Sequence, residues 1–269
     1  IYTDAANYQN NGAFEVAVEE WTRFLDRFGT DPLAPKALHY LGVCQLQLKQ
    51  YAKAAESFRQ VVTKYPDFEQ MEETCLNLGW CYYSLATAGD AAQYPLAAET
   101  FGKLAADHPK GKHVEQALFF EAESHYAVGK RKEAALAYGK LVTGFPESKL
   151  RSDALYALGV TLEELAEWAQ ASKAYDMFLE GYPTDELVTE VQMRKAETVL
   201  QQGDVALAGE MFAAVAGVDG FAAADHALLR QAYCATRLEK FPQAAALYVS
   251  LTERFPQSAE VPEATLAAA

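Results

Sequence analysis

Four cysteines and five histidines are the residues of this chain that could bind a metal ion or carry redox chemistry. Zinc sites use Cys and His ligands at short regular spacings, and redox-active thiols commonly form Cys-x-x-Cys pairs. The sequence contains no Cys-x-x-Cys pair, and no histidine lies four residues from another. We therefore expect no metal site and no cofactor.

Acid–base or nucleophilic catalysis would need other residue patterns, and these are also missing. Glu163 and Glu164 are adjacent carboxylates, but neighbouring helix residues point about 100° apart and do not form an acid–base pair. The sequence has no glycine-rich phosphate loop, no nucleophile elbow and no metalloprotease helix motif. We expect a protein that is not an enzyme.

Composition narrows the functional class further. The chain has 269 residues and a formal net charge of −14, which disfavours binding to nucleic acid or to anionic lipid. Abundant alanine favours an all-helical fold, and no run of 18 apolar residues predicts membrane insertion. The sequence lacks an initiator Met and ends inside an expected helix, so we expect it to be part of a longer protein.

Helix terminators recur along the chain at a spacing of about 37 residues, with one interval of 43. Prolines after an aromatic residue or histidine mark five of them: Pro66, Pro109, Pro146, Pro183 and Pro256. Gly29 and Gly220 fill the remaining places, and glycine, like proline, ends helices.

Three further positions repeat in phase with these terminators. The first is a small residue: Ala5, Gly42, Gly79, Ala122, Gly159, Ala196 and Ala232. Twelve residues later stands a second small residue: Ala17, Ala54, Ala134, Ala171, Ala208 and Ala244, with Ala97 displaced by the insertion Thr87–Gln93. Four residues beyond it stands an aromatic one: Trp21, Phe58, Phe101, Tyr138, Tyr175, Phe212 and Tyr248.

This pattern resembles the tetratricopeptide repeat family. The resemblance implies an all-α, right-handed solenoid of about seven antiparallel helical hairpins with a partial eighth, and it covers residues 1–269 as one domain. The template repeat predicts helices near 33–48 and 51–64, and the insertion should lengthen the first helix or the turn of its repeat. The Tyr/Phe-Pro-x-Ser variant is similar to repeats of the outer-membrane β-barrel assembly lipoprotein and the Tol–Pal coordinator.

The cysteines fit this repeat as buried residues. Cys44, Cys81 and Cys234 each lie two residues after the small residue of a first helix, and Cys75 lies four before Gly79. These positions face the expected core, where cysteine acts as a small apolar residue. Their equivalent places in different repeats are too far apart for a disulfide.

In the resembling family, ligand contacts come from the first helices, at positions −6, −3, +1, +4 and +5 from the small residue. Carried onto this chain, these positions are rich in aromatic and acidic residues, with Lys36 and Arg237 as their basic members. The candidate ligand groove is Glu73, Trp80, Tyr83, Phe119, Glu123, Tyr126, Tyr156, Glu163, Glu197 and Tyr233. Trp80, Tyr83, Phe119 and Tyr126 form its densest run; alternatively, such rings only pack against the next repeat.

Two functions remain open at this stage. The first is a scaffold that binds a peptide or helix of a partner protein, with basic residues facing the acids. The second is a glycan-binding envelope scaffold, as in exopolysaccharide export, which rests on fold analogy. We expect the bacterial periplasm or cell envelope, with the cytoplasm as the alternative. The C-terminal helix, Ser258–Ala269, has no polar cap and should fray or mediate self-association.

Overall fold

The computed structural model describes residues 1–268, which form fifteen α-helices and one short 3-10 helix and contain no strand. The all-α prediction is therefore confirmed. The chain divides into two compact units, Ile1–Leu150 and Arg151–Ala269, which we describe separately. That residues 1–269 form one continuous solenoid stays a prediction.

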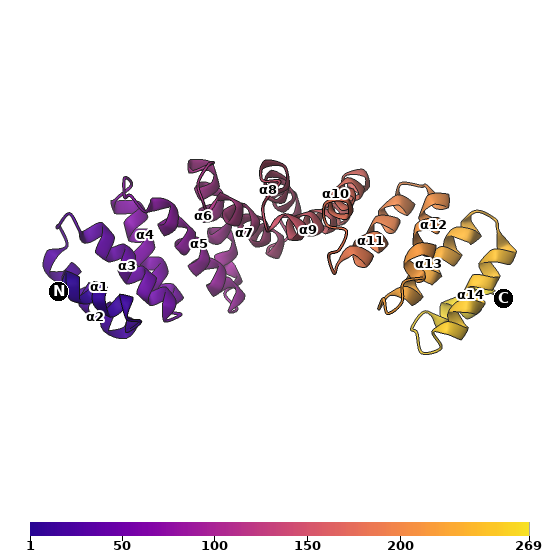
Figure 1. Cartoon of the computed structure of the whole chain (residues 1–269), viewed down its shortest axis with the longest axis horizontal. Coiled ribbons are helices and arrows are strands. Elements are labelled where there is room, and N and C mark those ends of the chain that lie inside the picture. The colour runs from indigo at the N-terminus through magenta and orange to yellow at the C-terminus, as the bar shows by residue number, and fades with distance from the viewer. Residues whose placement is uncertain (269) are drawn as a thin grey trace. The chain divides into compact units, whose positions relative to one another are not determined.

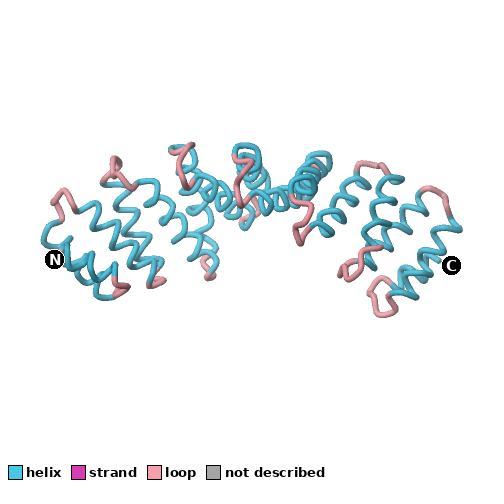
Figure 2. The backbone as a smooth tube through the Cα atoms, viewed as in Figure 1, coloured by secondary structure: helices cyan, strands magenta, loops and turns pink. Residues whose placement is uncertain are grey.

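Each unit is a series of helices joined by short loops (Figures 1 and 2). Unit 1 contains α1 (Tyr2–Asn10), α2 (Phe14–Phe28), α3 (Ala34–Gln47), α4 (Tyr51–Lys64), α5 (Met71–Thr87), η1 (Ala91–Gln93), α6 (Tyr94–Asp107), α7 (Val114–Ala127) and α8 (Arg131–Gly144). Unit 2 contains α9 (Arg151–Glu164), α10 (Trp168–Gly181), α11 (Val188–Gln201), α12 (Val205–Ala216), α13 (Ala224–Arg237), α14 (Phe241–Arg254) and α15 (Val261–Ala268). Odd-numbered helices are the first helices of the repeats.

The two helices of a hairpin meet through the repeated small and aromatic residues. In the first helix α5, a Cβ added to Gly79 would lie 2.5 Å from Cε1 of Phe101 on α6. The same construction at Gly159 of α9 falls 2.2 Å from Cε1 of Tyr175 on α10. Both rings are fully buried. Glycine therefore lets the helix backbone rest directly on the ring.

The turn inside each hairpin places one residue in the left-handed backbone region. These residues occupy matching places after the first helix: Gly12, Lys49, Gly89, Gly129, Ala166, Gly203 and Glu239. A residue in this conformation reverses the chain within a short turn, and glycine adopts it without steric cost. The turn positions thus keep the two helices of each hairpin antiparallel.

The insertion Thr87–Gln93 was predicted to lengthen either the first helix or the turn of its repeat, and it lengthens both. Helix α5 has 17 residues, whereas α3 and α7 have 14 each. The chain then turns at Gly89 and forms the 3-10 helix η1 before α6 begins. None of the three η1 residues is buried. The insertion is therefore an exposed elaboration at the hairpin end of this repeat.

The four cysteines are buried and form no disulfide, as the repeat positions predicted. Burial raises the pKa of Cys44, Cys75 and Cys234 to about 11 and that of Cys81 to about 12. These thiols stay protonated near neutral pH and are poor nucleophiles.

Helix bounds agree closely with the prediction from the repeat. Helix α4 has the predicted limits, and α3 is one residue shorter at each end. Helix α15 packs on α14 through the fully buried Ala264, while Leu266 is 80% exposed. Ala269 lies outside the described residues, so fraying or self-association of this helix stays a prediction. Among residues 1–268, no helix is long and apolar enough to cross a bilayer.

One half-buried acid breaks the pattern of the repeat. Glu121 precedes the small residue of α7 at a place where the earlier repeats have the buried Leu41 and Leu78. Its Oε2 atom is covered by protein and has no hydrogen-bond partner, and burial raises the pKa of this carboxyl. A covered carboxylate without a partner destabilises the fold at neutral pH.

We expect Glu121→Leu to raise the free energy of unfolding of unit 1 by about 1–3 kcal/mol at pH 7, because the orphaned acceptor is removed. Because the folded-state pKa is raised, the penalty exists at neutral pH and fades as pH falls, so the gain should shrink on acidification. Urea denaturation at both pH values measures this. Glu99→Leu, on an exposed position of α6, is the control and should change stability by less than about 0.5 kcal/mol. Equal effects of the two substitutions would refute the explanation.

Candidate functional site

An aromatic cluster on unit 1 joins α5 to α7. The ring centroids of Trp80 and Phe120 lie 4.2 Å apart, and those of Tyr83 and Phe120 lie 5.2 Å apart. Trp80 and Tyr83 meet edge to face at 5.9 Å. All three rings are half-buried, so each packs inward and still shows an edge or a tip to solvent. Such rings offer contact area at low entropy cost.

Phe120, which the sequence analysis did not select, is the centre of this cluster. Phe119, which it did select, lies 5.3 Å from Phe120 and 5.9 Å from the buried Tyr138 of α8. Phe120 occupies position −2 from the small residue, outside the positions carried over from the family. The available signal was the hydrophobic run Leu118–Phe120, which places a second ring next to Phe119.

The remaining candidate residues of unit 1 are Glu73, Glu123 and Tyr126, and each has a different environment. The Tyr138 hydroxyl donates a hydrogen bond to the Glu123 carboxylate, and this carboxylate helps burial to raise the pKa of Tyr83. The Arg131 guanidinium lies over the Tyr126 ring, with Cζ of Arg131 3.8 Å from the ring centroid. Glu73 is half-buried near the N-terminus of α5 and forms no ion pair within residues 1–268. Trp80, Tyr83, Phe119 and Phe120 form one aromatic cluster, and the Glu123 carboxylate acts on Tyr83. Glu73 lies about two helical turns before Trp80, and its charge acts on His39.

In unit 2 the candidate acids are held by arginines. Arg194 of α11 donates to Glu163 of α9 at 3.1 Å and to Glu190 at 2.9 Å. Its guanidinium also lies 5.6 Å from the ring centroid of Tyr156. Burial raises the pKa of Glu163, against the opposing effects of Tyr175 and Arg194. This network ties α9 to α11 and neutralises much of the acidity predicted there.

The next pair of first helices repeats this arrangement. Arg230 of α13 binds Glu197 of α11 with two hydrogen bonds of 2.6 Å each. Tyr233 lies 5.1 Å from the Arg230 guanidinium, and its hydroxyl accepts a hydrogen bond from Arg237. The bidentate geometry makes this a strong pair. Tyr156, Glu163, Glu197 and Tyr233 are thus part of an ionic ladder across unit 2 rather than a free acidic surface.

Arg194 and Arg230 share position −2 with Phe120, which is outside the five positions carried over from the family. The basic members of those five positions, Lys36 and Arg237, are therefore not the only basic residues on the first helices of unit 2 that meet the acids. Position −3 was also expected to contact a ligand, but His39, Leu76, Met193 and Leu229 are buried at this position. The first-helix face, meaning the surface formed by the first helices, is aromatic in unit 1 and charge-paired in unit 2.

The buried aromatic residue of each hairpin explains several of the polar candidates. Where the ring carries a polar atom, a polar residue on the first helix meets it: Trp21 bonds Gln9, Tyr175 bonds Glu163, and Tyr138 bonds Glu123. Where the ring is phenylalanine, the residue at position +4 carries no carboxylate or amide: Leu46, Tyr83 and Leu200. Glu123 and Glu163 therefore have structural roles, because they accept hydrogen bonds from hydroxyls on buried rings.

A double-mutant cycle on Tyr175 and Glu163 tests this coupling. Each single change, Tyr175→Phe or Glu163→Leu, should lower stability by about 1–3 kcal/mol, because it strands a buried polar partner. The double variant recreates the Phe212–Leu200 pair of the next repeat, so it should cost less than the sum by about 1–2 kcal/mol. Urea denaturation of the four proteins gives the coupling energy.

The reverse change serves as the control for that cycle. Phe58→Tyr in unit 1 places a hydroxyl opposite positions +1 and +4, which are Val43 and Leu46 and offer no side-chain acceptor, so it should lower stability. Strict additivity in the cycle, or an unchanged stability of Phe58→Tyr, would show that the hydrogen bond does not determine which residues pair at these positions.

Comparison with protein families identifies the repeats. A family model described as "Tetratricopeptide repeat" matches residues 3–67, and a second model of that description matches residues 153–185 and 226–258. Three segments of the chain, residues 3–67, 153–185 and 226–258, are therefore similar to tetratricopeptide repeats. Each matched tetratricopeptide segment ends one or two residues beyond an aromatic-Pro pair: Pro66, Pro183 and Pro256. No protein with a curated description matches the sequence.

Solved structures share this fold at low sequence identity. The C-terminal part of a TPR repeat-containing protein from Cytophaga hutchinsonii is 15% identical with a TM-score of 0.64, and the match covers 98% of this chain and 99% of that one. A tetratricopeptide repeat protein from Parabacteroides merdae is 13% identical with a TM-score of 0.52, covering 99% and 96%. A chain of the Naa15/Naa10 structure bound to HypK-THB is 12% identical with a TM-score of 0.69, covering 99% of this chain and 38% of that one.

These likenesses confirm the solenoid fold class. Repeats of this kind stack on their neighbours, and the stacking buries a continuous core. Within residues 1–268 no group of three or more His, Cys, Asp or Glu side chains is placed to hold a metal ion.

Proposed function

We propose that this chain is a non-enzymatic scaffold that binds a peptide or helix of a partner protein on the first-helix face of unit 1. The observation that carries the proposal is the half-buried aromatic cluster of Trp80, Tyr83, Phe119 and Phe120. It is fixed from below by buried Phe101 and Tyr138, so it is preorganised for contact.

The partner segment should carry an apolar anchor beside a basic residue. Glu123 is the acid beside Tyr83, and Glu73, about two helical turns before Trp80 on α5, is a second acid that has no ion pair among the described residues. In unit 2 the corresponding acids already bind Arg194 and Arg230, so they attract a basic partner less. The Naa15/Naa10 structure, whose description includes a bound HypK segment, supports a protein as the ligand of such a fold.

A peptide-display selection against the full chain tests the proposal. We expect enriched peptides to combine an aromatic or large aliphatic residue with Lys or Arg. Trp80→Ala should lower the affinity for a selected peptide by about 10–100-fold, because buried aromatic residues dominate binding energy. Glu73→Gln should weaken it less, and raised salt should weaken binding to the wild type.

Trp168→Ala is the matched control, since Trp168 lies on the second helix α10, away from the first-helix faces. It should leave peptide binding unchanged. Selected peptides that bind the wild type and Trp80→Ala equally well would count against this site.

We also propose the bacterial envelope as the location, supported by the resemblance of the Tyr/Phe-Pro-x-Ser repeats to envelope-type ones. The glycan-binding alternative would use the same aromatic rings to stack on sugar faces. Cell fractionation tests the location. A glycan array that retains binding to Trp80→Ala would exclude the sugar function at this cluster.

A further inference from the structure

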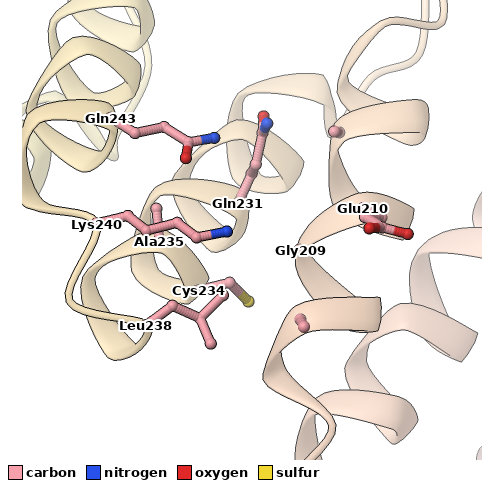
Figure 3. Close-up of a pocket in the computed structure, with 10 residues that line it drawn as sticks. Gly209, Glu210, Gln231, Cys234, Ala235, Leu238, Lys240 and Gln243 are labelled. Carbon is pink, nitrogen blue, oxygen red and sulfur yellow. The ribbon is translucent and has the colours of Figure 1, made fainter.

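A cavity opens on unit 2 between the second helices α12 and α14, above the first helix α13 (Figure 3). Its volume is about 230 Å³, which is room for a side chain rather than for a helix. Ala206, Gly209 and Ala213 of α12 form one wall, and Cys234 and Ala235 of α13 line it opposite that wall. The cavity is separate from the first-helix face, which the proposed function uses.

The sequence of α12 explains why the cavity forms here. Ala206, Gly209 and Ala213 occupy positions −2, +1 and +5 from the small residue Ala208. In every other second helix at least one of these positions holds a residue larger than alanine, such as Arg59 or Asp176. Gly209 also approaches α13 closely, since an added Cβ would lie 3.2 Å from Cβ of Cys234.

Hydrogen-bond donors converge on this cavity. Lys240 extends its ammonium group across Ala235, and the side chains of Gln231 and Gln243 lie above it (Figure 3). The Glu210 carboxylate is turned away from this ammonium. Lys240 forms no ion pair within residues 1–268, so its charge is available to a ligand.

The Cys234 side chain adds an inward-facing polar atom. Cys234 is 1% exposed and lines the cavity, and its thiol forms no hydrogen bond within residues 1–268. Leu238 lies at the rim and is 37% exposed, which provides an apolar contact next to the polar groups. The cavity thus combines one cation and neutral donors with a small-residue wall.

We propose that this cavity binds the carboxylate side chain of an acidic residue in a partner polypeptide, with Lys240 as its counter-charge. The amides of Gln231 and Gln243 donate to the carboxylate oxygens, and a large apolar residue next to the acid packs on Leu238. The chemistry is opposite to that of unit 1, where the acids favour basic residues. A partner could therefore meet the two units through segments of opposite charge.

Three capped tripeptides test this proposal on the full chain: acetyl-Leu-Glu-Leu-amide, acetyl-Leu-Gln-Leu-amide and acetyl-Leu-Lys-Leu-amide. The readout is the chemical shift of the Ala206, Ala213 and Ala235 methyl groups during titration. We expect the Glu peptide to shift these methyl groups at the lowest concentration and the Lys peptide to leave them unmoved.

Two variants separate the charge from the shape. Lys240→Gln should lower the affinity for the Glu peptide by about tenfold, because a hydrogen bond to a charged group is lost. Ala206→Leu starts from an exposed position and fills the cavity, so it should abolish binding. Lys173→Gln, an exposed lysine on α10, is the control and should have no effect.

Three results would overturn the proposal. They are equal shifts from the Glu and Lys peptides, unchanged Glu-peptide binding by Lys240→Gln, and no methyl shift with the Glu peptide. Unchanged methyl signals far from the cavity will show that the variants are folded.

Discussion

Gly79→Ala should lower the free energy of unfolding of unit 1 by about 2 kcal/mol, because the new methyl group overlaps a buried ring. The added Cβ would lie 2.5 Å from Cε1 of Phe101 and 2.7 Å from its Cδ1 and Cζ. Phe101 has no exposed surface and is packed against Trp80 and Phe120. The ring cannot move without disturbing the aromatic cluster that we propose as the binding site.

Gly139→Ala is the matched control for this substitution. Gly139 also lies inside a helix of unit 1, but nothing stands within 4 Å of an added Cβ. Alanine is the better helix former, so this change should raise stability by about 1 kcal/mol. Hydrogen exchange of amides in α5 and α6 measures the effect of Gly79→Ala, and exchange of amides in α8 measures that of Gly139→Ala. If the two substitutions changed stability in the same direction, close contact at Gly79 would not be the reason for glycine.

Acidification from pH 7 to pH 4 should lower the free energy of unfolding of unit 1 by about 3 kcal/mol through the titration of His39 alone. His39 is 1% exposed, and burial lowers its pKa to about 4. Its Nδ1 lies 2.8 Å from Oγ1 of Thr74, whose hydroxyl donates to the Gln70 carbonyl. The hydroxyl proton is thereby used, so Nδ1 carries the hydrogen and the ring is neutral.

The direction of this effect follows from the two states. The unfolded chain has an ordinary histidine with a pKa near 6.5, so it gains a proton before the folded protein does. Stability from this group is complete above pH 6.5 and is lost as pH falls towards 4. The rings of Tyr40, Phe58 and Phe68 surround the imidazole at 5.4–5.7 Å. The charge of Glu73 opposes the lowering of the His39 pKa, but burial outweighs it.

His39→Asn isolates the contribution of this residue. The Asn amide can still donate to Thr74, but it does not titrate. The variant should be less stable at pH 7, yet the stability difference from wild type should shrink by about 2 kcal/mol between pH 7 and pH 5 in urea denaturation. A difference that stays constant with pH would show that folding does not lower the pKa of His39.

The repeat could be predicted from the sequence because its signals are local. Aromatic-Pro pairs end the second helices, and the small and aromatic residues mark where two helices touch. The limits of α4 and the place of the insertion before α6 follow from those positions alone. The division at Leu150 does not follow from them, because the repeat pattern continues through it.

The candidate site was predicted only in part, because the partners of its residues lie on neighbouring repeats. Trp80 and Tyr83 were found as surface aromatics, but Phe120 was missed because position −2 was taken as non-contacting. The same omission hid Arg194 and Arg230, which bind Glu163 and Glu197. The polar atom on Tyr175 was a readable signal that Glu163 has a structural partner.

The most direct measurement of the central claim is the affinity of a display-selected peptide for wild type, Trp80→Ala and Trp168→Ala, each checked for helical content by circular dichroism. The account predicts a 10–100-fold loss for Trp80→Ala and none for Trp168→Ala. Equal affinity of all three folded proteins would contradict a binding site at the aromatic cluster of unit 1.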